Sequence, residues 1–301
     1  MSKISRKDFI HISGLSLSGT LIGFQTIYLE GNKGQNNNTT IQEIINLMTE
    51  AIEGEPLRRT VDTLKIGDPS QRCTGIVSTF LATADIIQKT ADLGANFIIT
   101  HEPTFYNHLD EVDWLEGDKV YQFKRELLEK NNITVWRYHD YWHRHKPDGI
   151  LQGFLESIGW EKYLKITRRN TGICNVPKIS LKNLAGYFKE TLNLKRPFII
   201  GNPNQECTKI GLLPGSWGPR SQMGMLRDDD IEVLVVGEVA EWETSEYVRD
   251  AAYAGMKKGL IILGHAPSEA PGMEYLVGWL KPKLPGIPIY YENTTDAFIP
   301  V

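Results

Sequence analysis

The spacing of apolar residues along the chain predicts an α/β protein. Three times, a stretch with apolar positions at helical spacing stops at glycine or asparagine, a short apolar run follows, and that run ends at a histidine. The predicted pairs are a helix at 84–93 with a strand at 96–100, a helix at 119–130 with a strand at 133–138, and a helix at 245–256 with a strand at 260–263. Helices that alternate with short apolar strands favour mostly parallel or mixed sheets covered by helices on both faces.

Further elements indicate that the body of the chain has two lobes. The remaining predicted elements are helices at 41–53 and 181–192 and strands at 209–213 and 231–236. We expect a first α/β lobe at 41–175 and a second α/β region at 176–301. The C-terminal part of the second region carries the third histidine, so we expect it to return to the first lobe and complete a shared site.

The first forty residues predict an export leader and a linker. Residues 5–10 read SRKDFI and precede a Ser- and Gly-rich apolar stretch, which resembles a twin-arginine signal with Lys7 at its second arginine. The polar run 31–40 is typical of a linker. We therefore expect export to the periplasm without stable membrane insertion after processing. An amphipathic helix or an uncleaved membrane anchor is the alternative interpretation.

Charge and cysteine content exclude two classes of function. The formal net charge is −4, which leaves no basic excess for binding nucleic acid. Cys73, Cys174 and Cys207 lie far apart and show no C-x-x-C spacing, so neither a zinc ribbon nor a disulfide framework is indicated. The sequence does not exclude a single disulfide bond between two of them.

Histidines gather where the predicted strands end. Six of the seven histidines lie at, or within ten residues after, the three strand ends. Ligands of parallel sheets bind at the carboxyl ends of strands, so these side chains can converge at one edge. Imidazole and carboxylate suit zinc, iron, manganese or nickel. The candidate metal ligands are His101, Glu102, His139, His143, His265 and Glu269.

Four imidazoles and two carboxylates are more ligands than one tetrahedral ion requires, which favours two metal ions. Glu269 is the first candidate to bridge them, and Glu238 or Glu241 is the candidate general base. Any one of these histidines alone would more often be a hydrogen-bonded loop residue; only their convergence favours a metal site. His108 and His145 are expected to be surface residues, or to contact the ligand residues without binding the metal themselves.

Two neighbouring features have both a functional and a structural interpretation. Tyr138, Tyr141 and Trp142 can form the wall of a substrate pocket, although aromatic residues beside a strand end are usually core. The glycine-bearing loop 215–220 can receive a phosphate through backbone N–H groups and Arg220, although a plain turn is the simpler interpretation.

The motifs together resemble a known family. The segments IGDP at 66–69, IITHEP at 98–103, YH at 138–139 with His143, and GHAPSE at 264–269 resemble the Nif-three-like dinuclear metal centre proteins, also called GTP cyclohydrolase I type 2-like. That family usually has His-His-Pro at 101–103 and aspartate at 143. The resemblance implies a two-lobed α/β fold, two divalent ions per subunit and a homo-hexameric ring.

Two metal ions favour a metal-dependent hydrolase that acts on a small-molecule phosphoester, nucleotide or amide. A protein that uses its metals for binding or assembly without turnover is the alternative from another class. GTP cyclohydrolase activity is a third possibility, which the name of the similar family alone suggests.

Overall fold

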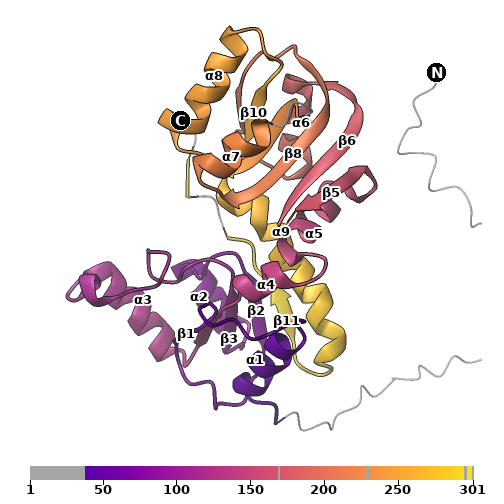
Figure 1. Ribbon diagram of the computed structural model, residues 1–301. Coiled ribbons are helices and arrows are strands. Elements are labelled where there is room, and N and C mark those ends of the chain that lie inside the picture. Colours follow the sequence, from indigo (N-terminus) through magenta and orange to yellow (C-terminus); the bar gives the residue numbers. More distant parts are fainter. Residues whose placement is uncertain (1–37, 169, 228–230, 295–296, 300–301) are drawn as a thin grey trace, which may run out of the picture. The chain divides into compact units, whose positions relative to one another are not determined.

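The structure is a computed structural model that describes residues 38–168, 170–227, 231–294 and 297–299 (Figure 1). The predicted export leader and linker cover 1–40, and residues 1–37 of that segment lie outside the described residues. The described chain forms two β-sheets with helices packed on them. No helix within the described ranges is both long and apolar enough to span a bilayer.

The first sheet has five strands and is mixed. In spatial order it contains β1 (Leu64–Ile66), β4 (Thr134–Arg137), β3 (Phe97–Thr100), β2 (Ile76–Thr79) and β11 (Ile289–Tyr291). The pairs from β4 to β11 are parallel and only β1 is antiparallel to its neighbour. Every residue of β2, β3 and β4 is buried, as expected for parallel strands covered on both faces.

Helices cover both faces of this sheet. On one face, apolar residues of α1 (Ile41–Glu50) pack with those of α9 (His265–Leu280) against Phe97 and Ile99. On the other, α2 (Ala84–Asp92) and α3 (Lys119–Lys130) pack against Ile98 and Val135. The short helix α4 (Asp140–Arg144) follows β4 directly.

The second sheet has six strands and is also mixed. In spatial order it contains β5 (Leu164–Arg168), β6 (Thr171–Ser180), β8 (Glu206–Ser216), β9 (Val233–Glu238), β10 (Gly259–Ile262) and β7 (Phe198–Ile200). The pairs β8–β9 and β9–β10 are parallel, whereas the outer strands run antiparallel. One face packs on α5 (Gly149–Ser157) and α6 (Leu181–Thr191), the other on α7 (Pro219–Leu226) and α8 (Glu246–Tyr253).

Short helical turns complete the connections. They are η1 (Asp113–Leu115), η2 (Glu161–Tyr163), the π-turn η3 (Glu241–Ser245) and η4 (Lys281–Lys283).

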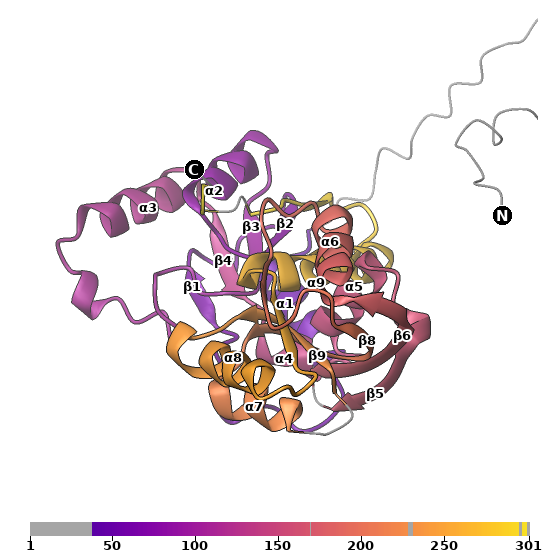
Figure 2. The same ribbon diagram turned by 90° about the horizontal axis from the view of Figure 1, so that it is seen from above.

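Helix α9 contacts both sheets and packs closely on α5 (Figure 2). The two helices approach at glycines: a Cβ on Gly153 would lie 2.6 Å from the Gly272 Cα, and one on Gly272 would lie 2.5 Å from the Ile150 Cα. Glycine, which has no side chain, allows the backbones of α5 and α9 to approach this closely. The close packing fixes where α9 begins, and its first residue is His265.

The α/β fold with two mixed sheets covered by helices confirms the predicted fold class. One expectation is corrected. The three strand ends that carry histidines do not share one sheet edge, because β3 and β4 belong to the first sheet and β10 to the second. Strand order depends on long-range pairing, which the local pattern does not contain. The three cysteines are buried free thiols.

Candidate metal centre

The candidate ligands lie at the ends of strands from both sheets. His101 and Glu102 follow β3. His139 follows β4 and occupies the N-cap position of α4, and His265 is the first residue of α9, shortly after β10. All six predicted ligand residues come together in one cluster, held by the contacts described next.

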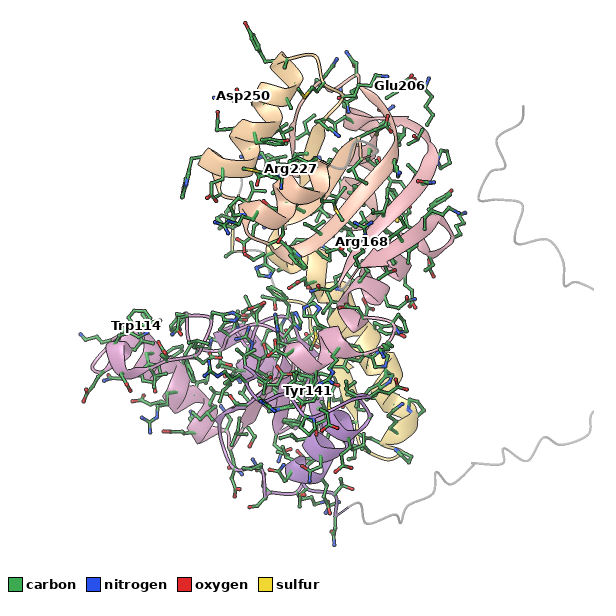
Figure 3. The ribbon with its side chains drawn as sticks, in the orientation of Figure 1. Trp114, Tyr141, Arg168, Glu206, Arg227 and Asp250 are labelled. Carbon is green, nitrogen blue, oxygen red and sulfur yellow. The ribbon has the colours of Figure 1, made fainter. Side chains whose placement is uncertain are left out.

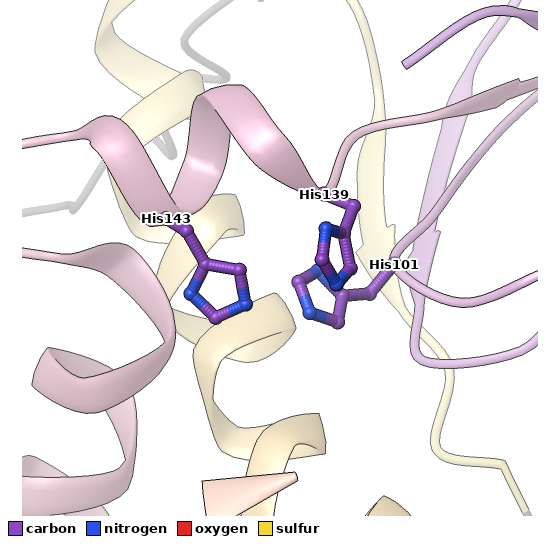
Figure 4. A group of neighbouring side chains, drawn as sticks. All are labelled: His101, His139 and His143. Atoms are coloured by element: carbon purple, nitrogen blue, oxygen red, sulfur yellow. The ribbon is translucent and has the colours of Figure 1, made fainter. Parts of the chain in front are cut away.

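Three histidines form one group of nitrogen donors (Figure 4). His101, His139 and His143 each offer a ring nitrogen, and these nitrogens lie within 4.8 Å of one another. The rings of His101 and His139 are stacked with centroids 4.6 Å apart, and the ring of His143 lies edge-on to both. Helical spacing places His143 one turn after His139 on the same face of α4.

Two carboxylates lie beside the histidines. His101, Glu102 and Glu269 form a second group with ligand atoms within 4.8 Å. Glu102 Oε1 lies 3.6 Å from Nε2 of both His139 and His265. Glu269 Oε2 lies 2.9 Å from His265 Nε2 and 3.5 Å from His101 Nε2. The two groups share His101.

The Nδ1 atom of each of the four histidines has its own acceptor. The pairs are His101 with the Tyr138 carbonyl at 3.2 Å, His139 with Asp140 at 3.0 Å, His143 with Asp148 at 2.9 Å and His265 with Glu238 at 2.9 Å. An imidazole whose Nδ1–H is donated outward keeps Nε2 as its free donor atom, and this arrangement is usual for metal-binding histidines. The cluster is therefore oriented for coordination through Nε2.

His101 provides a direct test of whether a cation fits. Its ring is fully buried, and its Nε2 has no hydrogen-bond partner among the described residues. A buried polar atom without a partner is costly, and native structures rarely keep one without a reason. A divalent ion would satisfy this nitrogen, and the surrounding imidazoles and carboxylates are suitable co-ligands.

Proton equilibria in the cluster also suit a cation. Burial, and then the nearby His139 and His143, hold the pKa of His101 well below its usual value, so its ring stays neutral. Burial and the charge of Glu269 raise the pKa of Glu102. Burial alone would lower the pKa of His265, but the hydrogen bonds to Glu238 and Glu269 raise it to about 10. At neutral pH His265 therefore carries a proton in the metal-free protein.

The sequence analysis missed Arg137, the last residue of β4. This side chain is fully buried. Its guanidinium donates to Glu102 Oε2 at 3.0 Å, to the His101 carbonyl at 2.9 Å and to the His108 carbonyl at 2.6 Å. It thereby holds Glu102 in place and offsets its charge. The sequence carries one signal for this role, because Arg137 is a charged residue inside an apolar run.

Asp62 and Asp148 hold the helical ligands and were also missed. Asp62 accepts the backbone N–H groups of His139, Asp140 and Tyr141 at 2.8–2.9 Å, which caps α4. Asp148 caps α5 through the Leu151 N–H and binds His143 through its other oxygen. The motif Pro-Asp-Gly before a helix could have indicated Asp148; Asp62 binds a segment about 77 residues away and left no local signal.

The other predicted residues lie around the cluster. Glu238 accepts the His265 Nδ1–H, which lowers the pKa of Glu238. Glu241 is exposed in η3 and makes no ion pair with any described residue of the cluster. His108 is exposed, and His145 packs against Trp142 and Trp279.

The predicted aromatic residues lie in the hydrophobic core, and the glycine-bearing loop 215–220 leads into a helix. Tyr138 and Trp142 are fully buried in the core. The loop at 215–220 leads into α7 with Gly218 at its N-cap. Within it, Gly215 has φ +82°, and a Cβ there would lie 2.0 Å from Glu269 Oε1, so the backbone needs glycine at this position.

Sequence comparison defines the class of protein that this fold and cluster represent. Residues 39–296 match the model of the Duf34/NIF3 (NGG1p interacting factor 3) family, and the chain belongs to that family. A relative from Clostridium perfringens, named GTP cyclohydrolase 1 type 2 homolog, is 24% identical over 77% of this chain and 87% of its own length. A relative of the same name from Clostridium acetobutylicum is 24% identical over 70% of this chain and 77% of its own length.

Solved structures show the same fold. The Bacillus cereus protein related to NIF3 superposes with a TM-score of 0.69 at 16% identity, over 88% of this chain and 100% of that one. A hypothetical protein from Staphylococcus aureus gives a TM-score of 0.68 at 16% identity, over 87% of this chain and 99% of that one. The two-sheet architecture is thus that of NIF3-like proteins.

Proposed function

We propose that this protein is a metal-dependent hydrolase with two divalent cations in the His/Glu cluster. The observation that carries the proposal is the orientation of the four imidazoles. Every Nδ1 has a hydrogen-bond acceptor outside the ligand set, and the buried Nε2 of His101 has no hydrogen-bond partner among the described residues. Such an arrangement is costly without a cation and is favourable with one. The chemistry of the donors suits zinc, iron, manganese or nickel.

A pair of divalent ions supplies Lewis acidity and lowers the pKa of water enough to provide a nucleophile near neutral pH. The six ligand residues would be His101, Glu102, His139, His143, His265 and Glu269, with Glu269 as the first candidate for a shared ligand. Glu238 or Glu241 would accept the proton from water. Glu238 is about half exposed and lies 2.9 Å from His265, which supports it over Glu241.

The substrate class of the proposed hydrolase is a phosphoester, a nucleotide or an amide. The test is a panel of these substrates, assayed with protein loaded with zinc, manganese, iron or nickel and with chelator-treated protein. We expect turnover that requires metal and that drops by at least about a hundredfold in His101→Ala, since loss of a ligand disrupts the centre.

His145→Ala is the matched control, because His145 lies outside the cluster and packs on Trp279. It should retain activity. Equal hydrolysis in chelator-treated protein would contradict the proposal, and a metal-loaded protein without turnover on any substrate would favour a binding or assembly role instead.

A GTP cyclohydrolase is the second candidate function. The curated relatives are named GTP cyclohydrolase 1 type 2 homolog, and that name is the observation in its favour. Incubating metal-loaded protein with GTP and following GTP by chromatography tests it. An unchanged amount of GTP would exclude GTP cyclohydrolase activity and leave the hydrolase proposal intact.

A further inference from the structure

A cleft of about 280 Å³ lies at the end of the second sheet, on the face that α7 covers. Leu213 and Ile173 come from the sheet, whereas Met225 comes from α7; these three side chains give the cleft an apolar wall. The Trp217 ring forms another wall, and its Nε1–H donates to the Pro214 carbonyl at 2.9 Å. This hydrogen bond fixes the plane of the indole, so the wall is preformed.

The cleft lies next to the candidate metal centre. Trp217 and Leu213 are each two residues from Gly215, where a Cβ would touch Glu269. Two residues span at most about 7 Å of chain. On the other side, Thr171 follows Asn170, whose Nδ2 lies 3.3 Å from His143 Nδ1. Both walls of the cleft are therefore attached to segments that touch metal-ligand side chains.

Among the described residues that line the cleft, Arg168 at the end of β5 is the one with a charged side chain (Figure 3). Its side chain is exposed, and it forms no ion pair with a carboxylate in the parts of the chain that the structure describes. An exposed guanidinium beside an apolar and aromatic wall is complementary to an organic anion. A volume near the lower end of the range of small-molecule pockets, about 300–1,000 Å³, suits one ring system rather than a polymer.

We propose that this cleft binds the ring of the substrate: an aryl or heteroaryl anion whose flat ring packs on Trp217 and whose negative group pairs with Arg168. The inference rests on the proposed function, because it names the substrate class of that same centre. A ring in the cleft leaves the rest of the molecule directed toward Glu269 and His143. The cleft thus selects small aromatic anions over aliphatic or uncharged esters.

The test uses the full chain after metal removal, so that binding in the cleft is separated from binding to a metal. Naphthalene-1-sulfonate is the probe, titrated by calorimetry; inorganic sulfate and naphthalene-1-methanol test the anion and the ring alone. We expect the naphthalenesulfonate to bind at least about tenfold more tightly than either, since ring burial and a charge-assisted pair both contribute.

Two variants address the cleft and one serves as control. Arg168→Met keeps the aliphatic stem and removes the charge, and Trp217→Leu removes the ring wall; each should weaken naphthalenesulfonate binding about tenfold or more. Arg249→Met removes an exposed arginine that pairs with Glu246 on α8, and should leave binding unchanged.

Metal content of the two cleft variants should equal that of the parent, because neither residue is a candidate ligand. Unchanged affinity in both cleft variants, or equal affinity for naphthalene-1-methanol, would overturn the proposal. Loss of hydrolysis with binding intact would instead count against the proposed function alone.

Discussion

At the residue scale, the buried pair of Arg137 and Glu102 shows how this cluster tolerates its charges. Two carboxylates lie among four imidazoles, and Arg137 brings a positive charge that pairs with Glu102. The resemblance noted in the sequence implies histidine in place of Glu102 and aspartate in place of His143. The exchange keeps one imidazole and one carboxylate, so the overall charge of the ligand set is unchanged.

Replacing Arg137 with methionine should destabilise the protein by about 3 kcal/mol, because Glu102 would be left buried without its partner. Urea unfolding of metal-free protein measures the change. The double variant R137M/E102Q should recover part of the loss, since it removes the uncompensated charge as well. Equal stability of R137M and the parent would contradict this account of the pair.

The proton on His265 predicts how stability of the metal-free protein depends on pH. Its folded-state pKa is about 10, above the value of about 6.5 expected in the unfolded chain. A raised pKa stabilises the folded state fully below the unfolded value, and this contribution is lost as the pH rises toward 10. The free energy of unfolding in chelator should therefore fall between pH 7 and pH 10.

Denaturant unfolding across this range, with His265→Gln beside the parent, measures the effect. His265→Gln should show a flatter profile, whereas His145→Gln should follow the parent. A parent profile that rises across the same range would show that the hydrogen bonds to Glu238 and Glu269 do not hold the proton.

At the scale of elements, the close approach of α5 and α9 positions the ligands on α9. Gly272→Ala would place a methyl group 2.5 Å from the Ile150 Cα, and a backbone atom cannot yield as a flexible side chain can. We expect a loss of about 1–3 kcal/mol in stability, as for other overpacked sites. The matched control is Gly278→Ala on the same helix, where a Cβ meets no atom within 4 Å.

Gly278→Ala should raise stability by up to about 1 kcal/mol through helix propensity. Thermal unfolding of both variants measures the contrast. Similar effects of the two substitutions would mean that α5 and α9 can move apart without cost.

The same helix marks a limit of sequence-based prediction. The strands before the histidines were predictable, because apolar runs bounded by glycine or asparagine stand out locally. Helix α9 was not predicted, since Gly264, Pro267 and Pro271 are usual signs of a loop. Pro267 lies in the first turn, where the absence of an N–H costs nothing, and packing on α5 stabilises the helix beyond it.

At the scale of the whole molecule, the cluster joins the two sheets. His101 and His139 follow strands of the first sheet, whereas His265 follows a strand of the second. The sequence indicated that these histidines meet and that the C-terminal part of the chain completes their site. It did not indicate that β10 belongs to a different sheet from β3 and β4, because strand order depends on long-range pairing. A cation held here would link the two sheets directly.

Metal binding should therefore stabilise the molecule as one unit. At a free metal concentration about a hundred times the Kd, the gain is about 2.7 kcal/mol for each ion bound. Calorimetric unfolding of apo and metal-saturated protein should give one transition that moves to higher temperature with metal. A transition that splits on metal addition would contradict the link between sheets.

The most direct test is the metal content of the protein itself. Purified chain is loaded with zinc or manganese, desalted and analysed by mass spectrometry for bound metal, alongside His101→Ala. The account predicts two ions per chain in the parent and a clear loss in His101→Ala, because His101 belongs to both groups of donors. A parent that retains no divalent metal, or a variant that retains as much as the parent, would contradict it.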